Sequence, residues 1–148
     1  MQSVQVRFIV ACAALSSGLL CATGAASSQA LTTWSGVYSA EQAAEGEAIY
    51  LERCATCHQP DLSGAEDAPQ LAGALFGTKW NDRTLAELFE LTRRTMPKDA
   101  PGGLTTKEYA QLLAHVLHRN GFPEGASPLS DRPDALKAIQ FVTQPSGR

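Results

Sequence analysis

Apolar residues recur at helical spacing in three segments, and each segment follows a polar residue suited to capping a helix. Ser39, Thr84 and Thr105 are each followed three positions later by Gln or Glu, the pattern of a capping box. We therefore predict three main helices, at 40–54, 85–94 and 106–120, and a short helix at 134–139. No window alternates apolar and polar residues as a half-buried strand would, so the predicted fold class is all-α.

The third of these helices has one apolar sector, formed by Tyr109, Leu112, Leu113, Val116 and Leu117. His115 and His118 fall outside that sector, so we expect both on the solvent side. Gly46 in the first helix has two interpretations. It allows a close helix crossing against Tyr109, or it is tolerated in mid-helix at a cost of about 1 kcal/mol.

Glycine and proline mark the ends and the connections. Gly121 is placed to close the third helix, with Pro123 beyond it. The segments 60–78 and 97–104 are rich in glycine and proline and are predicted to be loops.

The first thirty residues have the order of a secretory signal peptide. Arg7 precedes a short apolar run, and small residues continue to Ala30, where we place the cleavage; cleavage after Ala25 or Ala26 is the alternative. The run is shorter than the roughly 20 residues of a membrane span. We expect an exported, periplasmic protein without a membrane span after cleavage. The predicted organisation is 1–30 signal peptide, 31–39 lead-in, 40–123 main domain and 124–148 C-terminal extension, frayed from 144.

Length and charge exclude several classes. The chain has 148 residues, which fits one globular domain. Lys and Arg number 12 against 15 Asp and Glu, giving a net charge of −3, whereas nucleic-acid binders that neutralise phosphates are basic. Only Cys54 and Cys57 follow the signal peptide, so the disulfide-rich secreted class is also excluded.

The sequence Cys54-Ala55-Thr56-Cys57-His58 is C-x-x-C-H, the attachment motif of a c-type haem. Thiols three positions apart on a helical turn project from one side, and each can form a thioether. Three alternatives exist: a thioredoxin-type dithiol, which lacks its βαβ setting here; a zinc site with His115 and His118; and a small disulfide. We predict one covalently attached haem c, with His58 as an iron ligand.

Met96 is the candidate for the second axial ligand, because it is the sole methionine after the signal peptide. Pro97 pushes residue 96 out of helical geometry, which can turn the thioether toward a haem. The alternatives are a core Met that fills a gap, ligation by His115 or His118, and an open sixth position.

With His58 and Met96 both bound, the iron has no substrate site, and the predicted function is one-electron transfer, not catalysis. An open or labile sixth position would instead give a haem enzyme or ligand-binding protein, and a haem-free helical domain is the structural alternative.

With the haem motif, Pro69-Gln70-Leu71, Met96-Pro97 and the Tyr109 helix in that order, the chain resembles the class I cytochromes c over roughly 40–122. The resemblance implies a small cytochrome c fold around one haem. It also implies that the Pro69 carbonyl accepts a hydrogen bond from His58, that Leu71 lines the pocket, and that Trp80 donates to a haem propionate. Simple roles, as a loop proline for Pro69 and a core residue for Trp80, remain open.

A narrower similarity concerns the partners. Gly36-Val37-Tyr38-Ser39 and Asn120-Gly121-Phe122-Pro123 are similar to segments of cytochromes associated with quinoprotein (PQQ) dehydrogenases. This implies a dehydrogenase as electron donor and, as acceptor, a cytochrome or terminal oxidase.

The segment 79–98 carries five basic residues and three acidic ones. We hypothesise a mildly basic surface near Met96 that attracts an acidic partner; scattered charges on a solvated helix are the alternative.

Overall fold

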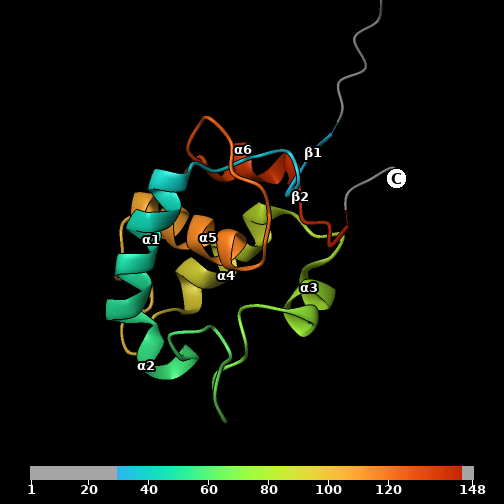
Figure 1. The fold of residues 1–148 in the computed structure, drawn as a ribbon. Coiled ribbons are helices and arrows are strands. Elements are labelled where there is room, and N and C mark those ends of the chain that lie inside the picture. The colour runs from blue at the N-terminus through green and yellow to red at the C-terminus, as the bar shows by residue number, and fades with distance from the viewer. Residues whose placement is uncertain (1–29, 145–148) are drawn as a thin grey trace, which may run out of the picture.

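The structure is a computed structural model and describes residues 30–144. The predicted signal peptide lies outside the described residues except for Ala30, and so does the predicted frayed end from 145 onward. Figure 1 shows the arrangement of the elements. In chain order they are β1 (Leu31–Thr32), α1 (Ala40–Arg53), α2 (Ala55–His58), α3 (Ala74–Trp80), α4 (Leu85–Thr95), α5 (Thr106–Arg119), α6 (Pro133–Lys137) and β2 (Ile139–Gln140).

The three predicted main helices are present as α1, α4 and α5, and the short helix at 134–139 is present as α6, shifted to 133–137. Two expectations are wrong. The segment 60–78 is not loop throughout, because α3 begins at Ala74 after Gly73, which offers no side chain to cap it. The expectation of no strands also fails, since β1 and β2 pair in parallel, with Leu31 opposite Ile139. Strands of two residues are too short to produce a visible alternation.

Local hydrogen bonds explain where α4 and α5 begin. The Thr84 hydroxyl accepts from the backbone N–H of Glu87, and the Glu87 carboxylate accepts from the backbone N–H of Thr84 at 2.9 Å. Thr105 and Glu108 form the same reciprocal pair at the start of α5. Each box satisfies backbone donors that a helix terminus leaves without partners.

At α1 only half of the predicted capping box forms. Ser39 accepts from the backbone N–H of Gln42, but the Gln42 side chain does not return to Ser39. Its amide instead donates to the Leu129 carbonyl at 2.9 Å and accepts from the Leu129 N–H at 2.6 Å. Gln42 is buried beneath the part of the chain that contains Leu129, and this burial favours the long-range pair over the local one.

Helices α1 and α5 cross in close contact at Gly46. A Cβ at Gly46 would lie 1.9 Å from the Gln111 carbonyl oxygen and 3.1 Å from the His115 Cβ. The close crossing is therefore confirmed, but its partners are Gln111 and His115, and the expected partner Tyr109 was wrong. The solvent-side placement of His115 was also wrong, because α1 covers that face and leaves the residue 2 % exposed. His118 is exposed, as expected.

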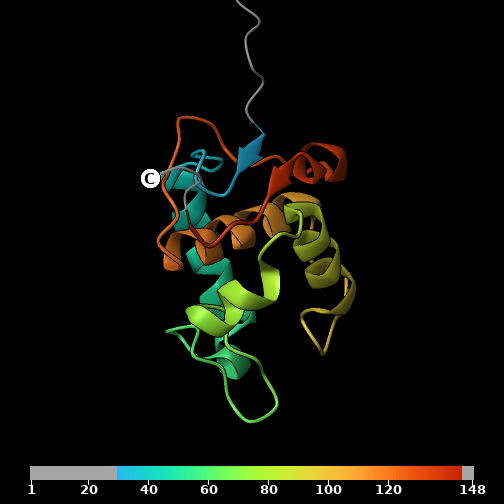
Figure 2. The same cartoon turned by 90° about the vertical axis from the view of Figure 1, so that its right-hand side faces the viewer.

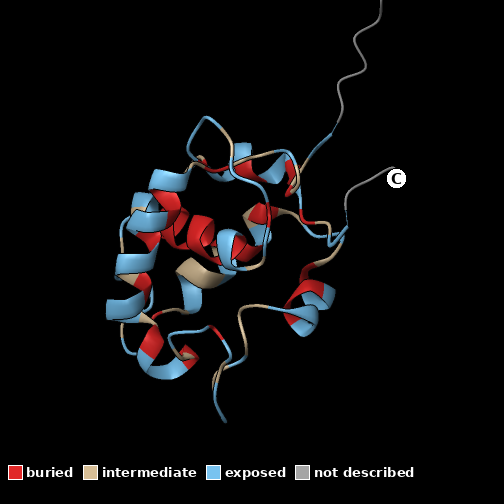
Figure 3. Cartoon of the chain, in the orientation of Figure 1, coloured by how far each residue is buried: buried red, intermediate tan, exposed pale blue. Residues whose placement is uncertain are grey.

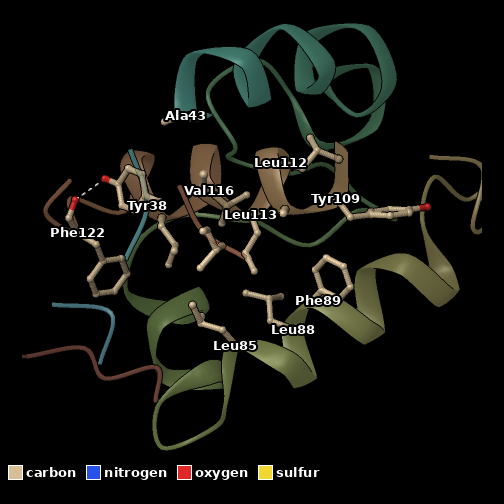
Figure 4. Packing of buried hydrophobic residues seen from close by; sticks show 14 of the residues in the cluster. Tyr38, Ala43, Leu85, Leu88, Phe89, Tyr109, Leu112, Leu113, Val116 and Phe122 are labelled. Atoms are coloured by element: carbon tan, nitrogen blue, oxygen red, sulfur yellow. Dashed lines mark hydrogen bonds between the residues drawn. The ribbon is translucent and has the colours of Figure 1, made fainter. Parts of the chain in front are cut away.

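Helix α5 forms the centre of the core. Every residue from Tyr109 to Leu117 is buried, because α1 packs on one side of the helix and α4 on the other (Figure 3). Figure 4 shows Leu85, Leu88 and Phe89 of α4 pointing toward the α5 side chains. At one end of this layer the Tyr38 hydroxyl donates to the Phe122 carbonyl at 2.6 Å.

The two ends of the described chain meet beside this helical core (Figure 2). The Thr33 N–H donates to the Gln140 carbonyl at 2.9 Å, and the Trp34 indole donates to the Val142 carbonyl at 3.0 Å. Residues 31–34 of the lead-in and residues 139–142 are thus hydrogen-bonded to each other beside the helices.

Candidate functional site

A cavity of about 640 Å³ opens between the helices, and all the site residues predicted from the sequence line it. They come from α2, from the loop before α3, from α3 and from the end of α4. Its walls are mostly apolar. The predicted residues at its surface are Cys54, Cys57, His58, Pro69, Leu71, Trp80 and Met96.

The loop that follows His58 contacts its imidazole ring on the Nδ1 side. Its Nδ1 lies 2.8 Å from the Pro69 carbonyl oxygen, which can accept a hydrogen bond only when Nδ1 carries the proton. That hydrogen bond leaves Nε2 with the free lone pair. His58 is 7 % exposed and lines the cavity, so burial and the Pro69 contact together fix the orientation of its ring.

The loop between His58 and Pro69 needs unusual backbone angles to make this contact. Gln59 and Leu62 adopt positive φ values of 64° and 67°. Gly64, with φ of 77°, donates its N–H to the His58 carbonyl at 2.9 Å, and a Cβ there would lie 2.5 Å from the Ala68 carbonyl oxygen. A glycine is therefore required where the loop turns back to bring Pro69 beneath the histidine.

The two cysteines lie at the rim of the cavity as free thiols. The backbone N–H groups of Cys57 and His58 both donate to the Cys54 carbonyl, so the motif forms one helical turn. Burial raises the pKa of Cys54 to about 11, with the cation Arg53 acting in the opposite direction. A thioredoxin-type dithiol belongs to a βαβ unit, whereas these cysteines lie where α1 ends and α2 begins.

Met96 lies at the cavity after the last turn of α4. Its backbone is extended, with φ of −129° and ψ of 153°, as expected for a residue before proline. The Tyr109 hydroxyl donates to the Met96 carbonyl at 2.6 Å and ties the loop to α5. Sequence reasoning placed Tyr109 in the core and missed this bond, for which the sequence carries no local signal.

The cavity wall opposite α2 is aromatic and belongs to α3. Phe76 and Trp80, four positions apart, both line the cavity and are buried. The Trp80 indole has no hydrogen-bond acceptor among residues 30–144, while Arg83 stacks 4.6 Å from its ring centroid. Phe76 was not predicted, although its spacing from Trp80 was the available signal for an apolar helical face.

These residues fit a haem attached by two thioethers. Two thiols stand on one helical turn, an oriented imidazole follows them, and a methionine lines the same apolar cavity. Those are the attachment groups and the axial ligands that a c-type haem requires. By contrast, no cluster of His, Cys, Asp or Glu within the described residues could hold a metal ion, which removes the zinc alternative with His115 and His118.

Fold and site together define the class of a c-type cytochrome, a mostly helical protein that carries haem c and transfers electrons. A family model described as cytochrome c oxidase, cbb3-type, subunit III matches residues 41–116, which is more than half of the chain. The chain belongs to that family. Searches of curated proteins and of solved structures found no match. Within 30–144, no helix combines the length and apolar character needed to cross a membrane.

Proposed function

We propose that this chain is an exported monohaem electron carrier, in which Cys54 and Cys57 hold the haem while His58 and Met96 bind its iron. The observation that carries this proposal is that all four residues line a single apolar cavity. When bound, the haem supplies reversible one-electron chemistry at its iron. Two protein ligands leave no position for substrate or oxygen, so the protein is a carrier and not an enzyme.

The surrounding residues have separate tasks. Pro69 holds the His58 ring in one tautomer, and hydrogen bonding to an axial histidine raises its strength as a ligand. Leu71, Phe89 and Leu113 give the site an apolar lining that excludes water, and the Trp80 indole N–H, which has no acceptor within 30–144, would be available to a haem propionate. A low-dielectric pocket and a thioether ligand both favour the reduced iron and raise the reduction potential.

We further propose that a dehydrogenase, of the quinoprotein type, donates the electron and that a terminal oxidase accepts it. The similarities at residues 36–39 and 120–123 support the donor, and the oxidase subunit named in the family description supports the acceptor. Export to the periplasm fits both partners.

Charge near the cavity supports docking of an acidic partner. Arg83 and Arg93 form ion pairs with Glu87 and Glu90, at 3.0 and 2.8 Å. Among the residues that line the cavity, the cations Arg53, Lys79 and Lys98 outnumber the carboxylates Asp67 and Asp99. Lys79 and Lys98 are exposed and form no ion pair within 30–144. Replacing both by Gln should slow electron uptake from the donor and weaken its dependence on ionic strength. Rates that ignore salt in the wild type would refute the charge-guided docking.

The carrier proposal is tested by substituting Met96 with Leu and, separately, with Ala. Leu retains most of the apolar volume but has no sulfur, so it separates ligation from gap filling. We expect both variants to lose the weak far-red methionine–iron band, to bind carbon monoxide when reduced, and to have lower reduction potentials.

A Met96→Leu variant with the wild-type spectrum and potential would show that Met96 only fills space. A wild-type protein that is already high-spin and binds carbon monoxide would assign the chain to the ligand-binding alternative. Leu91→Ala serves as the control, because Leu91 lies on the same helix and lines the cavity but cannot bind iron.

A further inference from the structure

The cavity wall formed by α3 has little support from the other helices. Helix α3 has seven residues, and its N-cap, Gly73, provides no side-chain hydrogen bond. The principal helix contacts are α1 with α5, α4 with α6, α1 with α2 and α4 with α5, and α3 takes part in none of them. In Figure 1 it lies apart from the other helices. A helix this short is unstable without tertiary contacts.

The C-terminal segment 139–143 supplies backbone contacts to the end of α3. The N–H of Phe141 donates to the Arg83 carbonyl at 2.7 Å, and the Phe141 carbonyl accepts from the N–H of Asp82 at 2.9 Å. Next along the chain, the Thr143 N–H and hydroxyl both donate to the Asn81 side-chain oxygen, at 3.0 and 3.1 Å. The residues directly after α3 are thus paired with a segment sixty positions away.

The same segment contacts α3 through side chains. The Phe141 ring is 1 % exposed and meets Phe76 edge to face, with centroids 5.9 Å apart. Phe76 in turn packs on Trp80 at 6.3 Å. A Cβ at Gly77 would lie 2.9 Å from the Thr143 methyl group, so segment and helix approach closely. Phe141 does not itself line the cavity; it stands behind Phe76, which does.

The segment is anchored on its other side. Gln140 pairs with Thr32 of β1 and, through an antiparallel bridge, with Thr84. Thr33 and Trp34 donate to the Val142 carbonyl from the lead-in. This part of the chain therefore connects the lead-in to the α3 wall, and it lies beyond residues 41–116, where the family model matches.

From this geometry we infer that segment 139–143 is a positioning element for the cavity, and that Phe141 is the positioning residue that holds Phe76 and Trp80 in place. The inference rests on the proposed haem site. Loss of Phe141 frees α3, admits water beside the porphyrin, and changes the environment of the iron without removing any residue that touches the haem.

The test compares Phe141→Ala with Leu136→Ala in the haem-loaded protein. Leu136 belongs to the same C-terminal part and is 0 % exposed, but it lies on α6, against α4. Both variants leave a hole in the core, so both lose global stability. Hydrogen exchange at the amides of Gly77 and Asn81, which bond within α3, reports on the wall itself.

We expect those amides to exchange about tenfold faster in Phe141→Ala than in Leu136→Ala under native conditions. The reduction potential should fall in the first variant and stay at the wild-type value in the second. Equal α3 exchange and equal potentials in the two variants would overturn the inference. If Phe141→Ala does not accumulate, Phe141→Leu takes its place, and we expect smaller changes in exchange and potential in the same direction. Exchange and potential equal to those of Leu136→Ala would again overturn the inference.

The two proposals fail differently. A preparation without covalent haem refutes the carrier proposal, whatever α3 does. If the protein carries its full haem content but α3 exchange and the reduction potential do not change in Phe141→Ala, only the positioning role is refuted.

Discussion

A single hydroxyl determines how firmly the chain after α4 is held. Tyr109 donates to the Met96 carbonyl at 2.6 Å, so Tyr109→Phe should free the loop that carries the proposed ligand. The loss is about 1 kcal/mol, which corresponds to about fivefold tighter binding of added imidazole in competition with Met96. Titration of the oxidised protein with imidazole measures it.

Tyr38→Phe is the matched control for that substitution. Tyr38 also donates to a backbone carbonyl at 2.6 Å, but the bond reaches Phe122 at the far end of the core. Both variants should lose similar stability, and only Tyr109→Phe should bind imidazole more tightly. Identical imidazole affinities would show that the Tyr109 bond does not restrain Met96.

His115 makes stability depend on pH. It is buried, its Nε2 has no hydrogen-bond partner within 30–144, and its ring lies 5.2 Å from that of Tyr50. Burial lowers the pKa of His115; Arg119 and His118 lower it further, and Glu47 opposes them. A lowered pKa means that the unfolded chain binds the proton more strongly than the folded one.

The free energy of unfolding should therefore fall as the pH drops below about 6.5, the ordinary histidine value, with a slope of up to about 1.4 kcal/mol per pH unit from this group. His115→Leu should remove that contribution, and His118→Gln should retain most of it, because burial is the largest cause of the His115 shift and His118 the smallest. Denaturant unfolding between pH 5 and 8 makes the comparison. A slope that survives in His115→Leu would assign it to other groups.

At the scale of the elements, the crossing of α1 and α5 depends on the absence of a side chain. Gly46→Ala improves helix propensity by about 1 kcal/mol, yet its Cβ would lie 1.9 Å from the Gln111 carbonyl. Overpacking of this kind costs about 1–3 kcal/mol, so we expect a net loss of stability. Ala48→Val, on the exposed face of α1, is the control and should cost only the lower helix propensity of Val, about 0.6 kcal/mol. A Gly46→Ala variant more stable than wild type would contradict the close crossing.

Local signals were sufficient for the elements whose ends are fixed by neighbouring residues. The Thr84 and Thr105 capping boxes predicted α4 and α5. The C-x-x-C-H motif predicted a helical turn with both thiols on one side, and that turn lines the cavity. Short-range patterns describe such features because the interacting atoms are three or four residues apart.

Features set by distant contacts could not be predicted. Helix α3 begins at Ala74 after a glycine N-cap and is held by residues 139–143, about sixty positions away. His115 lies off the apolar sector of its own helix, yet α1 buries it. The Gln42 side chain bonds to the backbone of Leu129 instead of returning to Ser39 in a local capping box. In each case tertiary packing outweighed a local preference, and no window of sequence contains both partners.

At the scale of the whole molecule, a cavity of about 640 Å³ with mostly apolar walls lies beside the packed helical core. Interiors packed to normal density avoid an apolar space of that size. We expect the haem to complete this core. Cys54→Ala combined with Cys57→Ala should give a largely unfolded product by circular dichroism, whereas Cys57→Ala alone should retain one attachment and more helix. A fully helical, cooperatively unfolding double variant would contradict a structural role for the haem.

Covalent attachment of the haem is tested most directly by the intact mass of the native exported protein, measured under denaturing conditions that release any haem not covalently bound. We expect the mass of the processed polypeptide plus one haem, and the loss of that increment when both cysteines are replaced. A mass equal to that of the bare polypeptide would contradict it.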